Sequence, residues 1–374
     1  MKKKEVPVLL LTGYLGSGKT TLLNRILGNE KGIKFAVIVN DIGEVNIDAS
    51  LIEKGGVVGQ GDDSLVALQN GCICCTLKMD LVNQIQDIIN QKRFDYIVIE
   101  ASGICEPEPI AQTICSIPTL GPQFIKNGVA RLDSIVTVVD AMRMQSEFNC
   151  GDDLMRNGIE EDDIESLLTQ QIEFCDTILL NKASDVSLEE RNRIKHIIKA
   201  LQPKAEIIEC DYGDVELDKI LNTHRFDYDR EIQSAGWIQS LENQENEEEG
   251  ETDEYGIGTF VYFRRPAFNL GKFDEFVARK WPKNIIRAKG ICYFEDERDM
   301  CYLFEQAGKQ QTIKQAGQWL ATMPKEQLDP LLAREENLRK DWDEHYGDRM
   351  IKLVFIGQNL DKEMLTRELD ACLE

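Results

Sequence analysis

The stretch that most limits the folds open to this chain is residues 6–27, VPVLLLTGYLGSGKTTLLNRIL. Its first part, from Val6 to Leu11, is short and apolar, which predicts a buried strand. From Lys19 onward, apolar residues recur at the spacing of a helix, whose inner face would carry Leu22, Leu23, Ile26 and Leu27. The turn between them is rich in glycine and fits the pattern GxxxxGK[ST]. Between a strand and a helix, this pattern predicts a loop that binds nucleotide phosphates, a P-loop.

Each residue type in this loop has a chemical reason to be there. Gly13 and Gly18 allow backbone N–H groups to converge on a β-phosphate at the start of the helix. The ammonium group of Lys19 would reach the β- and γ-phosphate oxygens, and the hydroxyl group of Thr20 would bind Mg2+. Lys19 and Thr20 are therefore also expected to take part in catalysis. The expected nucleotide-binding residues of the loop are Gly13, Gly16, Ser17, Gly18, Lys19, Thr20 and Thr21.

Further polar residues follow predicted strands, as a nucleotide site at a sheet edge requires. FAVIVNDIGEV predicts a strand from Phe35 to Val39 that leads into a polar segment, residues 40–44, suited to a switch loop. RFDYIVIEASG predicts a strand ending at Glu100, where P-loop enzymes usually place a magnesium-linked carboxylate. Glu100 is therefore the third expected catalytic residue. The structural alternative is an ordinary strand end followed by Ser102 as a helix cap.

Two more strands and two amphipathic helices complete this part of the chain. The strands are expected at 134–139 and 177–180, and the second delivers Asn181 and Lys182 to the same sheet edge. The helices are expected at 80–91 and 187–201. Strands that alternate with helices predict an α/β, P-loop NTPase domain with a largely parallel sheet. Since nucleotides bind at the carboxyl ends of such strands, Asn181 and Lys182 are expected to bind the nucleotide too.

A dense group of thiols, NGCICC, lies between the expected switch loop and Glu100. Cys72, Cys74 and Cys75 could bind Zn2+ or a neighbouring first-row metal, because thiolates are soft ligands, and a three-ligand shell leaves a position open for exchange. A purely redox role and a role as inert buried thiols are the alternatives. Other cysteines are expected to be small buried apolar residues: Cys115, Cys175, Cys210 and Cys372.

The charge and hydropathy of the chain limit the classes of partner that it is expected to bind. The 43 Lys and Arg against 66 Asp and Glu give a net charge of −23, which opposes binding to nucleic acid and to anionic membrane surfaces. No run approaches the roughly 20 apolar residues of a membrane helix. The short apolar run near Val6 is followed by the glycine-rich turn, and not by the small-residue cleavage site of a signal peptide. We therefore expect a cytoplasmic protein with no nucleic-acid and no membrane partner.

The rest of the chain predicts a linker and a second domain. In ENQENEEEGETDE, residues 242–254, eight of thirteen residues are acidic, which favours a flexible segment. We expect a P-loop domain at 1–228, an acidic linker at 229–256 and a smaller α+β domain at 257–374. The elements expected in this last domain are strands at 258–268, near Ile291, near Tyr302 and at 351–356, and helices at 273–280, 325–345 and 361–373. Cys292 and Cys301 flank an acidic turn, EDERD, and could face each other across a hairpin; packing in the core is favoured over a second metal site.

Several ordered motifs resemble one family, the CobW-like P-loop GTPases, many of which are metallochaperones. The motifs are GYLGSGKTTLLNRIL, VNDIGEVNID, NGCICC, VIEASGICEPEPI, VTVVDA, LLNKAS, IIRAKGICYF, LFEQAG and IKLVFIGQNLDKEMLTRELDACL. They cover almost the whole chain. The resemblance implies GTP, Mg2+ and Zn2+ or Co2+ as ligands, and a client apo-metalloenzyme as partner. It also implies that Cys72, Cys74 and Cys75 are the family's C-x-C-C, with Glu44 as a further metal ligand.

Three departures from the family pattern matter. The usual switch sequence has Glu and Phe where this chain has Asp41 and Ile42, and no His-rich stretch is present near the domain junction. The guanine-reading motif N-K-x-D is also changed, because Ser184 occupies the position of its Asp and Asp185 follows. A serine hydroxyl cannot accept two charge-assisted hydrogen bonds as a carboxylate does. We therefore expect a preference for GTP over ATP that is smaller than usual, unless Asp185 swings in.

Two functions from different classes follow. In the first, a GTP-hydrolysing metallochaperone changes the ligand set at the cysteines with its nucleotide state and delivers the metal to a client. In the second, the chain is a P-loop phosphotransferase acting on a small molecule, and the cysteines are structural. The first is favoured, because the residues after Glu100 lack the basic side chains of a substrate lid. The metal, the client and the oligomeric state, including a homodimer, stay open.

Overall fold

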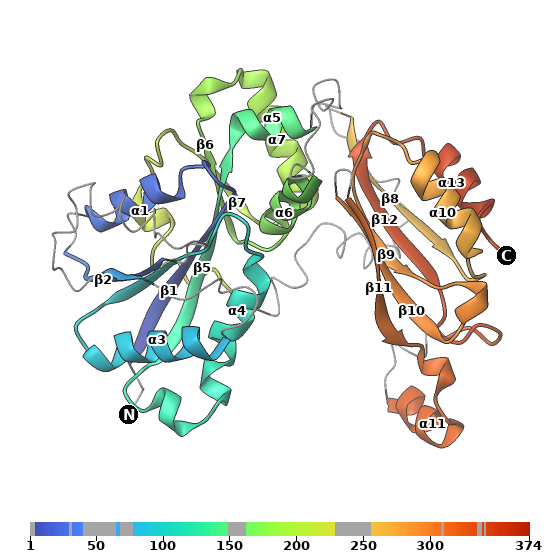
Figure 1. The fold of residues 1–374 in the computed structure, drawn as a ribbon, viewed down its shortest axis with the longest axis horizontal. Helices are drawn as coiled ribbons and strands as arrows, with labels where there is room; N and C mark the ends of the chain where they lie inside the picture. Colours follow the sequence, from blue (N-terminus) through green and yellow to red (C-terminus); the bar gives the residue numbers. More distant parts are fainter. Residues whose placement is uncertain are drawn as a thin grey trace. The chain divides into compact units, whose positions relative to one another are not determined.

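The computed structural model describes residues 4–29, 32–39, 65–67, 78–148, 162–228, 256–307, 310–334, 339 and 342–374. The chain divides into two compact units, the first with Met1–Asn149 and Leu167–Ala235 and the second with Cys150–Ser166 and Gly236–Glu374. Figure 1 shows that each unit is built on its own sheet. The predicted linker stays a prediction, because residues 229–255 lie outside the described residues.

The described part of the first unit has a seven-stranded sheet with the order β3-β2-β4-β1-β5-β6-β7. Every pair of neighbouring strands in it is parallel. The strands are β1 (Glu5–Thr12), β2 (Phe35–Val39), β3 (Leu65–Ala67), β4 (Tyr96–Glu100), β5 (Val129–Asp140), β6 (Thr177–Asn181) and β7 (Glu206–Glu209). All residues of β2, β4 and β6 are buried, as expected for parallel strands covered on both faces. The predicted α/β class is confirmed.

Helices cover this sheet (Figure 1). They are α1 (Lys19–Leu27), α3 (Lys78–Gln91), α4 (Pro107–Ser116), α5 (Ala141–Phe148), α6 (Asp162–Glu173) and α7 (Leu188–Leu201). Helix α1 buries Leu22 and Ile26 in one cluster with Leu9 and Leu11 of β1, as its apolar spacing predicts. Helices α3 and α4 contact each other, and α4 also contacts β1 and β5. The packing of α1 against β1 places the start of α1 at the carboxyl end of this central strand.

Some elements of the first unit differ from the sequence prediction. Ser102 does not cap a helix, because α4 begins later, with Glu106 as its N-cap. The Ser102 carbonyl instead accepts a hydrogen bond from Cys105 N at 3.0 Å, which closes a turn. Strand β5 begins five residues earlier than expected, at Val129 rather than Ser134. The polar Asp133 hides this extension in the sequence, yet Asp133 is fully buried and accepts a hydrogen bond from Tyr96 Oη at 2.6 Å.

The second unit holds a five-stranded sheet, again counted over the described residues, with the order β11-β10-β9-β12-β8. Its neighbouring strands are antiparallel. The strands are β8 (Ile257–Arg264), β9 (Ile285–Cys292), β10 (Met300–Ala307), β11 (Gln310–Gln318) and β12 (Ile351–Gln358). The helices are α10 (Leu270–Arg279), α11 (Lys325–Arg334) and α13 (Lys362–Asp370). This confirms the predicted α+β class.

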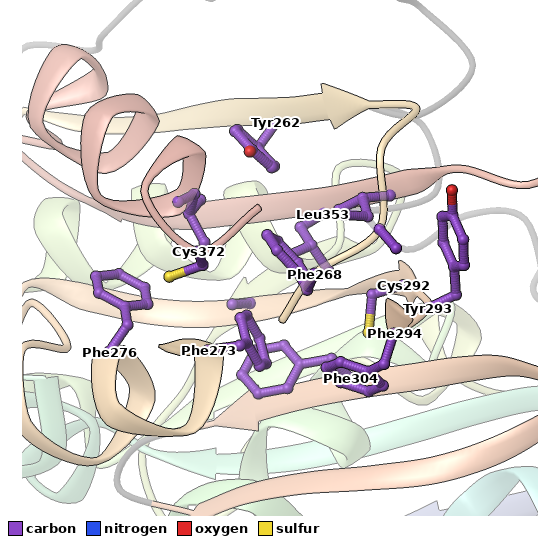
Figure 2. Close-up of a cluster of buried hydrophobic side chains, with 14 of the residues drawn as sticks. Tyr262, Phe268, Phe273, Phe276, Cys292, Tyr293, Phe294, Phe304, Leu353 and Cys372 are labelled. Atoms are coloured by element: carbon purple, nitrogen blue, oxygen red, sulfur yellow. The ribbon is translucent and has the colours of Figure 1, made fainter. Parts of the chain in front are cut away.

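Aromatic side chains form the core of this second unit (Figure 2). Phe268 and Phe273 are fully buried and stack with ring centroids 4.6 Å apart, and Phe304 meets Phe273 edge-on at 5.4 Å. Trp281 packs against the same group, 5.5 Å from the Phe304 ring. Such pairs each add about 0.5–1.5 kcal/mol beyond the burial of their area. The aromatic core therefore supplies much of this unit's stability.

Three expectations for the second unit need correction. Strand β11 was not expected, because its sequence QQTIKQAGQ is polar and mostly exposed. The charged helix does not reach His345, since Asp343 and Gly347 exchange backbone hydrogen bonds of 2.9 Å in a turn. In the β9–β10 pair, Cys292 lies opposite Tyr302 rather than Cys301, although both thiols are free and pack with the core.

No helix in the described parts of either unit combines the length and the apolar composition that a membrane span requires.

Candidate nucleotide-binding site

The GxxxxGK[ST] loop follows β1, which lies between β4 and β5 in the sheet. The side chains of Thr12 and Thr137 share a buried hydrogen bond of 2.8 Å at the carboxyl ends of β1 and β5. Nucleotides bind parallel sheets outside the carboxyl ends of the strands. The loop is therefore at the edge where a nucleotide site is expected.

The loop approaches its neighbours so closely that two of its glycines leave no room for a side chain. At Gly13, with φ of 133°, an added Cβ would lie 2.3 Å from the carbonyl oxygen of Val138. At Gly18, with φ of 111°, it would lie 2.3 Å from Asn181 Nδ2. Both φ values are also unfavourable for residues with a Cβ. These glycines thus allow a tight turn whose backbone N–H groups are free of steric cover by side chains.

The side chain of Lys19 folds back over the loop. Its Nζ atom donates hydrogen bonds to the carbonyl oxygens of Gly13 at 2.7 Å and Tyr14 at 3.2 Å, and the residue is only 7% exposed. Ser17 Oγ is buried and has no hydrogen-bond partner among the described residues. A cation and a buried hydroxyl group beside converging backbone amides fit an anionic ligand such as a phosphate.

Thr20 and Glu100 meet beside the loop. Thr20 Oγ1 donates a hydrogen bond to Glu100 Oε1 at 3.2 Å, and Glu100, the last residue of β4, is 1% exposed. A hydroxyl and a carboxylate oxygen are the hard ligands that Mg2+ prefers. A Cβ added to Gly103 would lie 2.7 Å from Leu15 N, so the turn after Glu100 packs directly on the loop. The Thr20 hydroxyl and the Glu100 carboxylate are therefore held close together by α1 on one side and by β4 and its following turn on the other.

Asn181 joins the loop to a second segment, which follows β7. Its Nδ2 atom donates to the carbonyl oxygen of Ser17 at 2.8 Å, and its Oδ1 atom accepts from Gly213 N at 3.1 Å. Lys182, in the left-handed region with φ of 56°, donates to the carbonyl oxygen of Gly16 at 3.1 Å and pairs with Asp140. The expected residues Asn181 and Lys182 thus contact the P-loop directly.

Two carboxylates at this site are not among the residues that were expected from the sequence. Asp140 ends β5 and pairs with Lys182, and Asp211 lies just after β7, where its Oδ1 accepts hydrogen bonds from Ser184 N and Ser184 Oγ, both at 3.0 Å. The signal that could have revealed both is their position at the carboxyl ends of parallel strands. Asp185, by contrast, is exposed, and its N–H group donates to the Lys182 carbonyl oxygen at 3.1 Å.

The proposed metal ligands cannot be placed with the nucleotide residues. Glu44, Cys72, Cys74 and Cys75 lie outside the described residues. Of the thiols expected to be buried apolar residues, Cys175, Cys210 and Cys372 are buried and Cys115 is half-buried, and all four are reduced cysteines outside disulfide bonds.

Burial raises the pKa of three of these thiols, Cys115, Cys210 and Cys372, and this limits their reactivity. The pKa of Cys115 rises to about 11 by burial, and that of Cys210 to about 11 by burial together with the charge of Asp211. A thiol with such a pKa is protonated at neutral pH and is therefore a weak nucleophile and metal ligand.

Comparison with protein families gives two matches. Residues 7–209 match the family model described as "CobW/HypB/UreG, nucleotide-binding domain". Residues 257–373 match the model described as "Cobalamin synthesis protein cobW C-terminal domain". The first match covers all the nucleotide-site residues named above except Asp211 and Gly213.

Individual relatives match different shares of the chain. The "Zinc-regulated GTPase metalloprotein activator 1" of Dictyostelium discoideum is 36% identical over 385 residues, covering 99% of this chain and 80% of the relative. The "Zinc chaperone YjiA" of Escherichia coli is 31% identical over 235 residues, 62% of this chain and 65% of the relative. A crystal structure of Zn(II)-bound YjiA GTPase matches with a TM-score of 0.43 at 20% identity, covering 99% and 100% of the two chains.

Proposed function

Because this chain belongs to the CobW/HypB/UreG family of nucleotide-binding proteins, we propose that it is a GTP-hydrolysing metallochaperone that binds zinc or cobalt and delivers it to a client metalloenzyme. Its relatives include a zinc-regulated GTPase metalloprotein activator and zinc chaperones. The protein is a GTPase. The proposed metal ligands are Cys72, Cys74 and Cys75, with Glu44.

The observation that best supports nucleotide hydrolysis is the convergence of Lys19, Thr20 and Glu100 on one loop. Lys19 would balance the charge that develops on the β- and γ-phosphate oxygens, as preorganised cations do in phosphoryl transfer. Thr20 and Glu100 would hold Mg2+, which neutralises phosphate charge when it is bound. The remaining expected contacts, from Gly13, Gly16, Ser17, Gly18 and Thr21, would orient the phosphates in the turn.

The proposal links the two ligands through the segment between β2 and α3. In the sheet, Val39, the last residue of β2, pairs with Glu100. The chain therefore enters residues 40–77, which include Glu44 and the three cysteines, beside the proposed magnesium ligand. A change in γ-phosphate contacts can act on this segment from its first residue onward, so nucleotide and metal affinities are expected to be coupled.

A zinc titration of four protein–nucleotide complexes tests the proposal. The forms are the wild type with magnesium and GTP, the wild type with magnesium and GDP, and Cys74→Ser with each nucleotide. We expect tighter zinc binding in the GTP form by about 1–3 kcal/mol, the usual size of an allosteric coupling. Bound zinc must then strengthen GTP binding by the same amount. Cys74→Ser should remove the coupling and leave metal-free GTP binding intact.

Equal zinc affinities in the two nucleotide states would contradict the chaperone mechanism. Metal content gives an independent check, because zinc or cobalt should be present in stoichiometric amounts and be lost when Cys72, Cys74 or Cys75 is changed to Ser. Cys210→Ser is the matched control, since its thiol is buried, has a raised pKa and is therefore a weak metal ligand, so its loss should not affect the metal content. Metal that persists in the cysteine-motif variants would remove these residues from the site.

A further inference from the structure

Two loops of the first unit meet where the guanine-reading residue of a GTPase is expected. One loop follows β6 and contains Ser184 in place of the Asp of N-K-x-D. The other follows β7 and contains Asp211. Their side chains are in direct contact, because Asp211 Oδ1 accepts hydrogen bonds from both Ser184 N and Ser184 Oγ at 3.0 Å. A carboxylate is therefore present next to the position from which the sequence motif has lost one.

The loop that carries Asp211 is fixed to the nucleotide site at several points. Gly213 N donates to Asn181 Oδ1 at 3.1 Å, and a Cβ added to Gly213 would lie 3.1 Å from the backbone of Leu22 in α1. Arg25 of the same helix donates to the carbonyl oxygen of Tyr212 at 2.8 Å and to Asp214 Oδ1 at 2.8 Å. The position of Asp211 is thereby set relative to the P-loop helix.

The Asp211 carboxylate keeps the capacity to accept more hydrogen bonds. Both bonds from Ser184 go to Oδ1, and Oδ2 makes no hydrogen bond within the described structure. Asp211 is also only half-buried, so a ligand can reach it. Asp185, the other nearby carboxylate, makes no side-chain hydrogen bond to a described residue that would orient it.

We propose that Asp211 is the residue that reads guanine in this protein and that Ser184 orients it. The inference rests on the proposed function as a GTPase. Compared with the usual motif, the carboxylate has moved from the loop after β6 to the loop after β7, and a hydroxyl group stands in its former place. With both residues present, the preference for GTP need not be smaller than usual.

The chemistry of the bases explains what Asp211 would select. Guanine presents two donors, N1–H and the N2 amino group, and a carboxylate accepts from both with charge-assisted hydrogen bonds. Adenine presents a lone pair at N1, which a carboxylate repels. Xanthine keeps N1–H but has an acceptor oxygen at position 2, so it matches an amide side chain, which has one acceptor and one donor group.

Replacement of Asp211 by Asn tests this assignment through nucleotide binding. We expect Asp211→Asn to bind GTP about 10- to 100-fold more weakly, since a charged hydrogen bond to the base edge is lost. The same variant should bind XTP more tightly than GTP, which is the reverse of the wild type. ATP affinity should stay low in both. Asp185→Asn is the matched control, and it should keep the wild-type order of nucleotides.

Two further variants distinguish a loss of base recognition from a folding defect. Asp211→Ser alone should lose the preference for GTP over ATP, and the double variant Ser184→Asp with Asp211→Ser should regain it, because the carboxylate returns to the usual motif position. An unchanged preference for GTP over XTP in Asp211→Asn, or a reversal in Asp185→Asn, would overturn the assignment. Failure of the wild type to bind GTP at all would instead overturn the proposed function, so the two failures are distinguishable.

Discussion

The phosphate end and the base end of the nucleotide site are built in different ways. The phosphate end is almost continuous in sequence, since Gly13 to Gly18 form one turn that leads directly into Lys19 and Thr20 of α1, and Glu100 joins them from β4. The base end joins two loops, with a contact between Ser184 and Asp211, 27 residues apart. A continuous motif is visible in the sequence, whereas a pair of residues on separate loops can exchange roles without leaving a local pattern.

Two lysines provide the sharpest test of this difference. Both donate to carbonyl oxygens of the P-loop, Lys19 to Gly13 and Lys182 to Gly16. We expect Lys19→Ala to lower the rate of GTP hydrolysis by on the order of 100-fold or more, because Lys19 would act on charge that develops in the transition state. Lys182→Ala should mainly weaken GTP binding and change the turnover number far less. Equal losses of turnover in steady-state kinetics would show that the two ends are not distinct.

Asn181 connects the two ends, and its removal should affect both. Asn181→Ala leaves the N–H group of Gly213 without its acceptor in a buried place, which costs about 1–3 kcal/mol. We expect a decrease of this size in the free energy of unfolding, measured with urea, and weaker GTP binding. Asn127→Ala is the control, because its hydrogen bond to Asn90 is exposed and its loss should cost much less. If stability is unchanged in Asn181→Ala, the two ends are held together by other contacts.

Glu100 belongs to the phosphate end but comes from a different strand. Glu100→Gln keeps the size of this buried side chain and removes its charge. We expect the magnesium concentration needed for half-maximal hydrolysis to rise by about 10-fold, and the thermal stability to change little. The measurement is the rate of GTP hydrolysis as a function of magnesium. An unaltered magnesium requirement would count against a metal-holding role for Glu100.

The smallest effect is expected at Glu209, which ends β7 two residues before Asp211. Its pKa lies below the ordinary value because Lys195 donates a hydrogen bond to it at 2.7 Å and because Lys195 and Arg191 are positively charged, against an opposing effect of burial. A lowered pKa in the folded state stabilises the protein above the ordinary carboxyl pKa, and this stabilisation is lost as the pH falls through the lowered value.

A pH series checks this last prediction. Since Glu209 is partly exposed, its interactions are worth about 1 kcal/mol or less. The unfolding free energy of the wild type should exceed that of Glu209→Gln at neutral pH, and the difference should shrink below about pH 4. A difference that is constant with pH would mean that Glu209 contributes through packing alone.

Local patterns account for the parts of the fold that the sequence predicted well. Strands β1, β2, β4 and β6 are apolar runs, and α1, α3 and α7 have apolar residues at regular helical spacing. Both patterns can be recognised in the sequence. The polar strand β11 and the start of β5 could not be recognised, because exposure in one case and the buried Asp133 in the other break the apolar pattern. The charged helix was overextended because charge alone does not mark where a helix ends.

The same distinction between local patterns and tertiary contacts applies to the residues of the candidate site. The positions of Lys19, Thr20 and Glu100 could be expected from a motif and a strand end, and they meet as a P-loop site requires. Asp140 and Asp211 could have been noticed as carboxylates after strands, but their partners Lys182 and Ser184 could not be assigned, since these pairs depend on the order of strands in the sheet. The roles of Glu44 and the three cysteines stay predictions, because they lie outside the described residues.

The distribution of aromatic residues makes the two units optically different. All tryptophans lie after residue 236, and Trp281 and Trp319 pack among the rings of the second unit. Intrinsic tryptophan emission therefore arises from that half of the chain, and the P-loop unit up to residue 236 is silent at the same wavelengths. Tyr212, 78% exposed beside Asp211, is a natural place for an added fluorophore. A tryptophan introduced there would add an emission that reports base binding, while the emission of the unmodified protein reports on the other unit.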